Sequence, residues 1–469
     1  MSMNAAEYVA TLVERAKKAQ AIAENFSQEQ VDELCAAIAY NGTKKEFATD
    51  LSKMLVEESG MGLVDHKFGK MMTKIKGTYR DMKNEKSVGV IERNEALGLI
   101  KLGKPVGVVG ALIPVTNGEA TPFCKAISAI KGRNAIILAP HPKAKNTNKV
   151  AGDAIRATLK KYGAPEDLVI GIDPEYVSVE VSGELMKQVD MVLATGGTPM
   201  VKAAYSSGTP TIGVGTGNAS VIIDGSTNLD TVADMVMRSK TFDHATSCST
   251  ENNLIIDEKV YDDFVEALKK QGGYFISNDS PEKAQLRDGV WPDGHTLNRH
   301  IVAQSVEKIA EVAGLTLPAG TKFIVVEEDG IGENHRFSAE KLSVITTLHK
   351  YTDFEDALDK LDAILEFMGQ GHSCGIHTKY DYRVLQLADR IKAARIMVNQ
   401  PQCLANSGAW TNGMPMSMTL GCGTWGNNSV SHNVTWKDLL NTTWISYPIE
   451  STQPTDEELF PAAVVEFNK

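Results

Sequence analysis

The chain has 469 residues, of which 42% are hydrophobic and 23% charged, and its formal net charge is -11. This length exceeds one ordinary hydrophobic core, so we expect two or three domains of a soluble globular protein. The negative charge excludes nucleic acid and an anionic membrane as main partners, because both require a basic surface. It does not exclude a local basic pocket for a small anion.

Cysteine use and hydropathy indicate the compartment. The six cysteines show no C-x-x-C pair and no dense framework, which excludes a zinc ribbon and a disulfide scaffold. Charged residues interrupt the apolar positions near the N-terminus, so no signal peptide is expected. No apolar run reaches the roughly 18 residues that a membrane span needs. We therefore predict a cytoplasmic protein with reduced thiols, no membrane contact and no metal site.

The chain begins with helical patterns and then changes to β structure. Residues 3–80 show helical periodicity almost throughout, and Ser27 with Gln30 forms a capping box at the start of the second helix. From Ser87 onward, apolar residues alternate on both sides of a polar turn, which predicts a projecting β-hairpin over 87–103. A lone hairpin is marginally stable, so we expect it to pair with another sheet, such as one from another subunit.

Short apolar runs then alternate with helical patterns, as they do in βαβ units with a parallel sheet. Strands are expected at 106–112, 135–139, 168–172, 191–194, 211–214 and 220–223. Helices are expected at 119–130, 145–162, 176–187 and 198–207. An open sheet of this kind binds ligands at the carboxyl ends of its strands.

Two of these strand ends carry residues suited to a phosphate group. The first, at 139–145, places a histidine and two lysines at the positive end of a helix. The second, at 194–198, is a run of small residues that lets the backbone approach a phosphate closely. Neither segment matches G-x-G-x-x-G, and the second fits a plain helix entry equally well.

The half that begins near Ser239 repeats the α/β pattern. Strands are expected near Leu254 and at 322–326, 344–348, 375–377 and 395–398, with helices at 260–272, 299–313 and 354–368. Between 400 and 433 the composition shifts to Gly, Asn, Ser and Trp, which indicates a long functional loop ordered by its tryptophans. The tail from Trp436 onward is strand-like and is expected to add to a neighbouring sheet.

The segment 242–253 places one cysteine, Cys248, among small polar residues between a helical pattern and an apolar run. Helix, exposed loop and strand in this order would present a thiolate for attack. The alternative is a buried cysteine that behaves as a small hydrophobe, the usual state of a free thiol. Neighbouring hydroxyls, which include Thr246 and Ser247, favour the nucleophile because they can support a thiolate or an oxyanion.

Three further motifs carry a family resemblance. They are the run Pro-Val-Gly-Val-Val-Gly-Ala-Leu-Ile-Pro-Val-Thr-Asn at 105–117, the runs Ala-Thr-Gly-Gly and Met-Val-Lys-Ala-Ala-Tyr at 194–197 and 200–205, and the glycine-rich run at 420–431. The first resembles the segment that holds the oxyanion asparagine in the aldehyde dehydrogenase superfamily, and the others resemble its CoA-acylating branch. The resemblance covers nearly the whole chain.

The resemblance implies an α/β, aldehyde dehydrogenase-like fold with a Rossmann-type cofactor domain, an α/β catalytic domain and a projecting oligomerisation hairpin. By position, the dinucleotide-binding domain spans 1–238 and includes the hairpin at 87–103. The catalytic domain spans 239–430, and a C-terminal return segment with an oligomerisation strand spans 431–469. A homodimer or homotetramer is implied.

The resemblance also implies roles for single residues. It makes Cys248 the nucleophile and Asn117 the oxyanion donor, together with the Cys248 backbone N–H. His372 lies where acylating members keep a histidine near the active site, although a core histidine explains it equally well without the family. The residues expected around NAD or NADP are His141, Pro142, Lys143, Thr195, Gly196, Gly197 and Glu340. Lys143 stands near the adenosine ribose in place of a carboxylate, so a 2'-phosphate is not repelled and NADP stays open.

One departure from the superfamily bears on the chemistry. Hydrolytic members carry a glutamate base where this chain reads Gly-Val-Gly-Thr-Gly-Asn at 213–218. Without a base to activate water, a thioester on Cys248 would last until another thiol takes the acyl group. We therefore expect CoA as the acceptor, with His372 assisting deprotonation of its thiol. A hydrolytic or phosphorylating reductase on the same fold is the catalytic rival, and a non-catalytic oligomeric scaffold is a remote alternative.

The residues before the nucleophile bear on the substrate. Acetaldehyde-using relatives place aliphatic residues there, whereas this chain has His244, Thr246 and Ser247, with a polar Asn406 downstream. The run is similar to that of the acylating sulfoacetaldehyde dehydrogenases, whose substrate carries a sulfonate that needs hydrogen-bond donors. We predict conversion of the small aldehyde sulfoacetaldehyde to sulfoacetyl-CoA, with acetaldehyde to acetyl-CoA as the alternative. Capping of the loop alone would also account for these residues.

Overall fold

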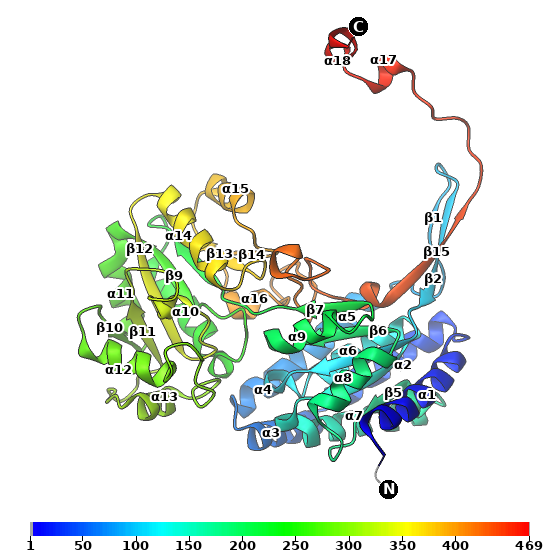
Figure 1. Cartoon of the computed structure of the whole chain (residues 1–469), viewed down its shortest axis with the longest axis horizontal. Coiled ribbons are helices and arrows are strands. Elements are labelled where there is room, and N and C mark those ends of the chain that lie inside the picture. The colour runs from blue at the N-terminus through cyan, green and yellow to red at the C-terminus, as the bar shows by residue number, and fades with distance from the viewer. Residues whose placement is uncertain (1–2, 469) are drawn as a thin grey trace.

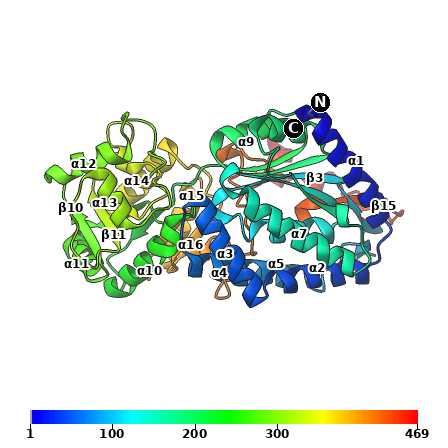
Figure 2. The same cartoon turned by 90° about the horizontal axis from the view of Figure 1, so that it is seen from below.

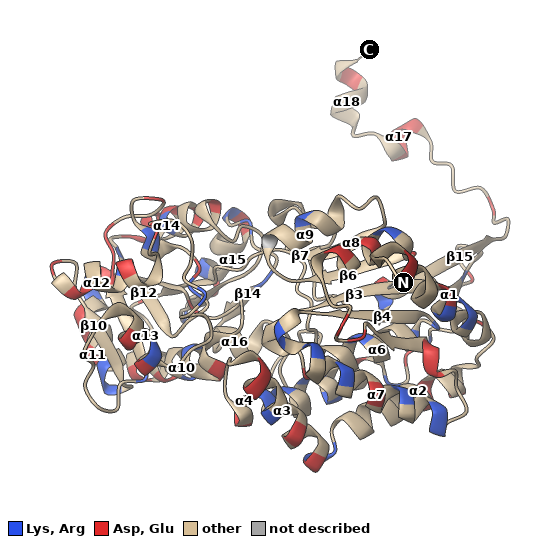
Figure 3. Cartoon of the chain, turned by 60° about the horizontal axis from the view of Figure 1, so that its bottom comes forward, with Lys and Arg blue, Asp and Glu red and all other residues tan. Residues whose placement is uncertain are grey.

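A computed structural model describes residues 3–468 of the chain. Two α/β bodies lie side by side, and a narrow three-stranded sheet leads from one of them to an extended C-terminal tail (Figure 1). Lysine, arginine, aspartate and glutamate are intermixed over the outer helices of both bodies (Figure 3). In the part of the chain that the structure describes, no helix has the length and apolar character of a membrane span.

The first body is built on a five-stranded parallel sheet in the order β5-β4-β3-β6-β7. Its strands are β3 (Val108–Ile113), β4 (Ala135–Pro140), β5 (Val169–Gly171), β6 (Met191–Thr195) and β7 (Thr211–Val214). The helices between them are α6 (Thr121–Lys131), α7 (Lys145–Lys161), α8 (Val179–Gln188) and α9 (Thr198–Tyr205). Every residue of β3 and β4 is buried, as expected for strands with helices on both faces.

The N-terminal helices pack on the first body. They are α1 (Ala5–Ala23), α2 (Gln28–Gly42), α3 (Lys45–Ser59), α4 (Val64–Lys70) and α5 (Lys76–Met82). Helix α1 lies against α8, and the helices α2 to α5 run along another side and reach the second body (Figure 2). A π-helical segment, η1 (Met71–Ile75), joins α4 to α5 in one continuous helix. The predicted capping box is confirmed, since Ser27 and Gln30 exchange hydrogen bonds between side chain and backbone.

The second body holds a seven-stranded parallel sheet in the order β10-β11-β12-β9-β8-β13-β14. Its strands are β8 (Ser220–Ile223), β9 (Asn253–Asp257), β10 (Gly273–Ile276), β11 (Phe323–Glu327), β12 (Ile345–Tyr351), β13 (Cys374–His377) and β14 (Ile396–Val398). Its helices are α10 (Leu229–Thr241), α11 (Tyr261–Lys270), α12 (Pro281–Val290), α13 (Val306–Ala313), α14 (Phe354–Phe367), α15 (Asp381–Arg390) and α16 (Gln402–Ala405).

The position of β8 corrects the expected division of the chain. This strand was expected in the series of the first sheet, with the domain boundary at 238, but it pairs with β9 and β13 of the second sheet. The change of sheet therefore falls between Val214 and Ser220. A short apolar run predicts a buried strand but does not indicate its neighbours, so the pattern alone misplaced the boundary.

A second expected boundary also moves. The helix expected over 299–313 begins only at Val306, because Ser305 caps it by accepting a hydrogen bond from the Lys308 N–H. The preceding residues form turns, and Ala303 has a positive φ of 57° that a helix does not allow.

The predicted hairpin is confirmed as β1 (Gly89–Asn94) and β2 (Leu99–Pro105). The tail supplies its partner within the same chain, because β15 (Leu440–Ser446) pairs antiparallel with β2. Beyond β15 the chain extends away from both bodies and ends in two short helices, α17 (Asp456–Leu459) and α18 (Ala462–Phe467) (Figure 1). The predicted role of this sheet in assembly stays a prediction.

Candidate active site

Three neighbouring strands of the first sheet end in the segments expected to bind a ligand. β3 leads into the turn η2 (Val115–Asn117), β4 into the turn η3 (Pro142–Ala144), and β6 into the turn at Gly196 and Gly197 that opens α9. Because β4, β3 and β6 are adjacent and parallel, these turns share the carboxyl edge of the sheet.

The same edge meets the loop that carries Cys248. This loop runs from η5 (Phe242–Ala245) to β9, and Cys248 is half-buried within it. A Cβ added at Gly217, in the connection after β7, would lie 2.1 Å from the Cys248 carbonyl oxygen. The two backbones are therefore in contact, which places the thiol at the junction of the two bodies.

Cys248 is paired with a histidine from the second body. The Cys248 Sγ lies 3.1 Å from His372 Nε2, and His372 Nδ1 lies 2.8 Å from the Ser373 hydroxyl. The Arg395 guanidinium holds this segment by donating to the His372 carbonyl oxygen at 2.7 Å. The predicted nucleophile and the predicted histidine, 124 residues apart in the chain, are in direct contact.

Burial sets the charge of this pair. It raises the pKa of the Cys248 thiol well above its usual range, and the nearby Glu340 carboxyl adds to the rise. It lowers the pKa of His372 to about 3, with a further contribution from the Arg395 charge. Both shifts favour the neutral forms, so the resting pair is a thiol beside a neutral imidazole.

Asn117 is held by a lysine that the sequence patterns did not single out. Lys70 Nζ donates to the Asn117 Oδ1 at 2.7 Å and to the Thr246 hydroxyl at 3.1 Å. Because Oδ1 accepts this bond, the amide N–H groups are directed away from Lys70. Lys70 thus links the predicted oxyanion donor to the nucleophile loop.

This arrangement can be compared with known proteins. The Aldehyde dehydrogenase family model matches residues 1–285. A sulfoacetaldehyde dehydrogenase from Acholeplasma sp is 45% identical over 96% of this chain and 92% of its own length. An acylating sulfoacetaldehyde dehydrogenase from Bilophila wadsworthia is 43% identical over 96% of this chain and 97% of its own. The chain belongs to the aldehyde dehydrogenase family.

A solved structure of this family confirms the expected fold. An acetylating aldehyde dehydrogenase from Geobacillus thermoglucosidasius superposes with a TM-score of 0.91 at 36% identity, over 96% of this chain and 98% of that one. The predicted aldehyde dehydrogenase-like fold, with two α/β bodies and a projecting hairpin, is therefore correct.

A buried ionic cluster lies beneath the nucleophile loop of this family member. The Asp243 carboxylate pairs with Lys70 and lies 2.8 Å from Lys67 Nζ, and the two ammonium groups hold its pKa well below the usual range despite burial. Asp243 begins a run of three non-glycine residues with positive φ, at 52°, 52° and 59°. Such a run is strained, and the ion pairs of Asp243 stabilise it.

The Glu251 carboxylate, which follows Cys248 in the chain, connects the nucleophile loop to the long segment after β14. Glu251 accepts hydrogen bonds from the Ser239 hydroxyl at 2.5 Å and from the Gln402 N–H at 2.9 Å. Burial raises the pKa of Glu251 to about 7. Glu251 follows Cys248 by three residues, so this contact places the segment 402–408 close to the thiol.

The residues expected around the dinucleotide lie at the ends of β4 and β6, which flank β3, and at one half-buried position of the second body. His141, Pro142 and Lys143 are exposed, and His141 Nδ1 accepts a hydrogen bond from the Lys143 N–H at 3.1 Å. Thr195 accepts a bond from Lys125 Nζ at 3.0 Å. Glu340 comes from the second body, and burial raises its pKa to about 8.

Of the four residues expected around the substrate, three lie in the nucleophile loop and one, Asn406, lies directly after α16. Thr246 donates to Asp243 at 2.8 Å and Ser247 shares a hydrogen bond with Ser249 at 2.8 Å, so both belong to the loop itself. Asn406 is buried, and its Oδ1 has no hydrogen-bond partner among residues 3–468. His244 is half-buried, and burial lowers its pKa, while the charges of Asp243 and Glu307 act in the opposite direction.

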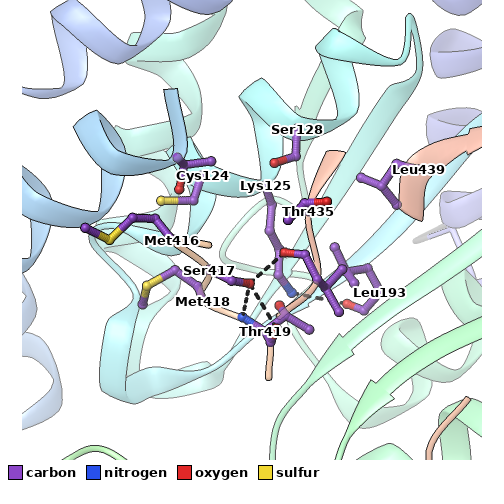
Figure 4. Close-up of a pocket in the computed structure, with 12 residues that line it drawn as sticks. Cys124, Lys125, Ser128, Leu193, Met416, Ser417, Met418, Thr419, Thr435 and Leu439 are labelled. Atoms are coloured by element: carbon purple, nitrogen blue, oxygen red, sulfur yellow. Dashed lines mark hydrogen bonds between the residues drawn. The ribbon is translucent and has the colours of Figure 1, made fainter. Parts of the chain in front are cut away.

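A small cavity lies behind α6 (Figure 4). Its walls come from α6, from β6 and from the long loop, and include Cys124, Lys125, Ser128, Leu193, Met416, Ser417, Met418 and Thr419. Lys125 Nζ donates to the Leu112 and Leu193 carbonyl oxygens at 2.8 and 3.2 Å as well as to Thr195. Burial lowers the pKa of Lys125 to about 7. Through these hydrogen bonds Lys125 holds the carboxyl end of β6 at Thr195.

Proposed function

We propose that the chain is a CoA-acylating aldehyde dehydrogenase that forms a thioester on Cys248 and takes sulfoacetaldehyde as its preferred substrate. One observation carries the choice of CoA over water. A Cβ added at Gly213 would lie 2.8 Å from the Tyr205 ring, and the Tyr205 hydroxyl accepts a hydrogen bond from the Gly213 N–H at 2.9 Å. The ring fills the space that a glutamate base at this position would need.

The proposed chemistry follows from the Cys248 and His372 pair. The thiol must lose its proton to solvent before it attacks the aldehyde carbon. His372 Nε2 lies 3.1 Å from Cys248 Sγ, within reach of a second thiol that approaches the same sulfur, and we assign it the deprotonation of CoA. The oxyanion that forms is stabilised by the Asn117 amide and the Cys248 backbone N–H. After oxidation, the acyl group remains on Cys248 as a thioester. The thiol of CoA then attacks the thioester carbonyl, and Cys248 leaves as thiolate.

The residues present fit a nicotinamide dinucleotide. A Cβ added at Gly196 or Gly197 would meet its nearest atom at 3.8 or 3.9 Å, so these glycines leave room for a phosphate group beside the backbone. Glu340 Oε1 is buried without a hydrogen-bond partner in the described chain, and a ribose hydroxyl would satisfy it. When bound, the nicotinamide supplies the acceptor for the hydride that leaves the aldehyde carbon.

The similarity to sulfoacetaldehyde dehydrogenases over nearly the whole chain supports the choice of aldehyde. So does the surplus of cationic and hydroxyl groups around the thiol, since a sulfonate needs hydrogen-bond donors. A pocket built for an anion discriminates against a neutral aldehyde, because its polar groups then stay unpaired.

The test is a panel of small aldehydes assayed with and without CoA and with NAD or NADP. We expect CoA-dependent reduction of the cofactor, with kcat/KM for sulfoacetaldehyde above that for acetaldehyde by at least about 100-fold. Cys248→Ser should abolish turnover, because a serine hydroxyl is a much weaker acid and a much poorer nucleophile than a cysteine thiol. Turnover at the same rate without CoA would contradict the acylating assignment, and equal efficiency on both aldehydes would contradict the sulfonate preference.

A further inference from the structure

The helix that runs from α4 through η1 to α5 carries Lys67, Lys70 and Lys74. Their spacing of three and four residues puts them on one face of the helix. The π-helical segment η1 includes Lys74 and follows Lys70 directly. Such segments occur frequently at functional sites. This face points at the nucleophile loop, since Lys70 contacts Asn117 and Thr246.

Two of these three cations form an ion pair and one does not, although the Asp81 carboxylate acts on it from a greater distance. Lys67 and Lys70 share the Asp243 carboxylate. Lys74 Nζ instead donates to the carbonyl oxygens of Ser407 and Gly408, at 3.1 and 2.7 Å, and lies 3.8 Å from the Met416 sulfur. Within residues 3–468 no carboxylate lies at ion-pair distance from Lys74.

A partly buried ammonium without an ion-pair partner is costly in free energy. Burial accordingly lowers the pKa of Lys74 to about 8. Two buried hydroxyls also lack hydrogen-bond partners among the described residues, that of Thr78 on the same helix and that of Thr250 in the nucleophile loop. Thr78 follows Lys74 by one helical turn, and Thr250 follows Cys248 by two residues. Both are buried donors that an anion's oxygen atoms can accept from.

The position of this cation matches the substrate. In sulfoacetaldehyde a single methylene separates the sulfonate from the aldehyde carbon. Lys70 Nζ lies 2.7 Å from Asn117 Oδ1, so the cationic face begins at the oxyanion donor and continues to Lys74 one turn along the helix. The Ser407 and Gly408 carbonyls that hold Lys74 follow Asn406 in the segment that Glu251 fastens beside the thiol.

We propose that Lys74 is the residue that binds the sulfonate of the substrate, at a subsite formed by this helix face and the segment 402–408. This inference rests on the proposed function, because the subsite belongs to the same acyl site. In this subsite the anion supplies the ion-pair partner that Lys74 lacks, and the ammonium exchanges a carbonyl contact for a charge-assisted hydrogen bond. The subsite gives the enzyme its preference for an anionic aldehyde.

The test compares Lys74→Met and Lys74→Arg with a matched control, Lys76→Met. Lys76 lies on the exposed side of the same helix. For each protein, kcat/KM is measured with sulfoacetaldehyde and with propionaldehyde, which has a methyl group in place of the sulfonate. We expect Lys74→Met to lower the ratio of the two values by about 100-fold, mainly through KM for sulfoacetaldehyde. In Lys74→Arg the ratio of kcat/KM for sulfoacetaldehyde to that for propionaldehyde should fall only slightly. In Lys76→Met this ratio should be unchanged.

A second measurement does not depend on turnover of the anionic aldehyde. Ethanesulfonate, which has no carbonyl group, should compete with propionaldehyde, and its inhibition constant should rise about 30-fold in Lys74→Met. An unchanged inhibition constant and an unchanged ratio would overturn the subsite. Equal losses on both aldehydes would also overturn it, since Lys74 would then only hold the segment 402–408. Failure of the proposed function would appear separately, as the absence of CoA-dependent turnover in the unaltered enzyme.

Discussion

Asn117 can serve as an oxyanion donor only if its amide presents N–H groups to the reacting carbonyl. Lys70 fixes that orientation, because its ammonium group donates a hydrogen bond to the Asn117 Oδ1 at 2.7 Å. A charge-assisted bond to the amide oxygen also polarises the amide and strengthens its N–H groups as donors. Lys70 is therefore a positioning residue that acts through Asn117.

A double-mutant cycle tests this coupling. Asn117→Ala should lower kcat roughly 100-fold, the usual effect of losing one oxyanion donor. Lys70→Met should lower kcat about tenfold in the unaltered enzyme but cause little further loss in the Asn117→Ala background. The measurement is kcat of the unaltered enzyme, the two single variants and the double variant, and thermal melts check that each protein is folded. Losses that add in the double variant would show that Lys70 acts independently of Asn117.

His372 touches the thiol directly, yet its expected role is in the second half of the reaction. Removing a general base for CoA should leave the first turnover of cofactor reduction intact and slow later turnovers by roughly 100-fold. Rapid mixing of His372→Ala with aldehyde and cofactor, before and after CoA is added, separates the two phases. Higher pH should restore part of the rate, because the CoA thiol then ionises without help. If the first turnover is lost as well, His372 serves to activate Cys248.

The contrast between Cys248 and Lys70 shows how far sequence reasoning reaches. Cys248 and Asn117 stand in local motifs whose neighbours indicate their chemistry. Lys67, Lys70 and Lys74 sit on an amphipathic helix, where lysines usually form a solvated face, and their partners come from segments more than 40 residues away. Nothing local distinguishes a buried lysine from an exposed one. Periodicity is a local signal, so it predicted most helix and strand positions correctly. For the same reason it could not reveal the lysine cluster, whose contacts are made between distant segments.

At the scale of elements, the short connection from β7 to β8 controls the nucleophile loop. It crosses from the first sheet to the second directly against Cys248, and only glycine fits at 217, because an added Cβ would lie 2.1 Å from the Cys248 carbonyl oxygen. The sequence pattern joined β7 and β8 in one sheet. It could not show that the five residues 215–219 carry the chain between the two bodies.

Gly217→Ala should therefore displace the Cys248 loop while both sheets remain folded. We expect kcat/KM to fall by roughly 100-fold, because a shift of about 1 Å in a reacting group is sufficient for such a loss. Gly183→Ala in α8 is the matched control, since nothing lies within 4 Å of a Cβ added there. Equal activity of the two variants would mean that the loop moves aside at no cost to catalysis.

At the scale of the whole molecule, the three-stranded sheet and the tail beyond it expose many apolar side chains. Trp444 is 55% exposed, Tyr447 57% and Phe467 91%. An exposed strand edge with apolar side chains pairs readily with another chain. The tail contacts neither body in Figure 1, so we expect its apolar side chains to pack against a second copy of the chain.

We expect light scattering at micromolar concentration to show a dimer or tetramer, and deletion of residues 447–469 to reduce its size or its solubility. Leu385→Ser is a control for the loss of an exposed apolar side chain elsewhere, since Leu385 is 70% exposed on α15. A monomer of the complete chain at this concentration would contradict the prediction.

The extended tail has a consequence for any measurement on dilute enzyme. A segment that packs only on a neighbouring copy adds free energy to folding in proportion to the logarithm of the concentration of that copy. The melting temperature should then climb with protein concentration, and a sample diluted for an assay should lose activity over time as subunits separate. Two laboratories that prepare the same protein at different concentrations would report different stabilities, and both values would be correct.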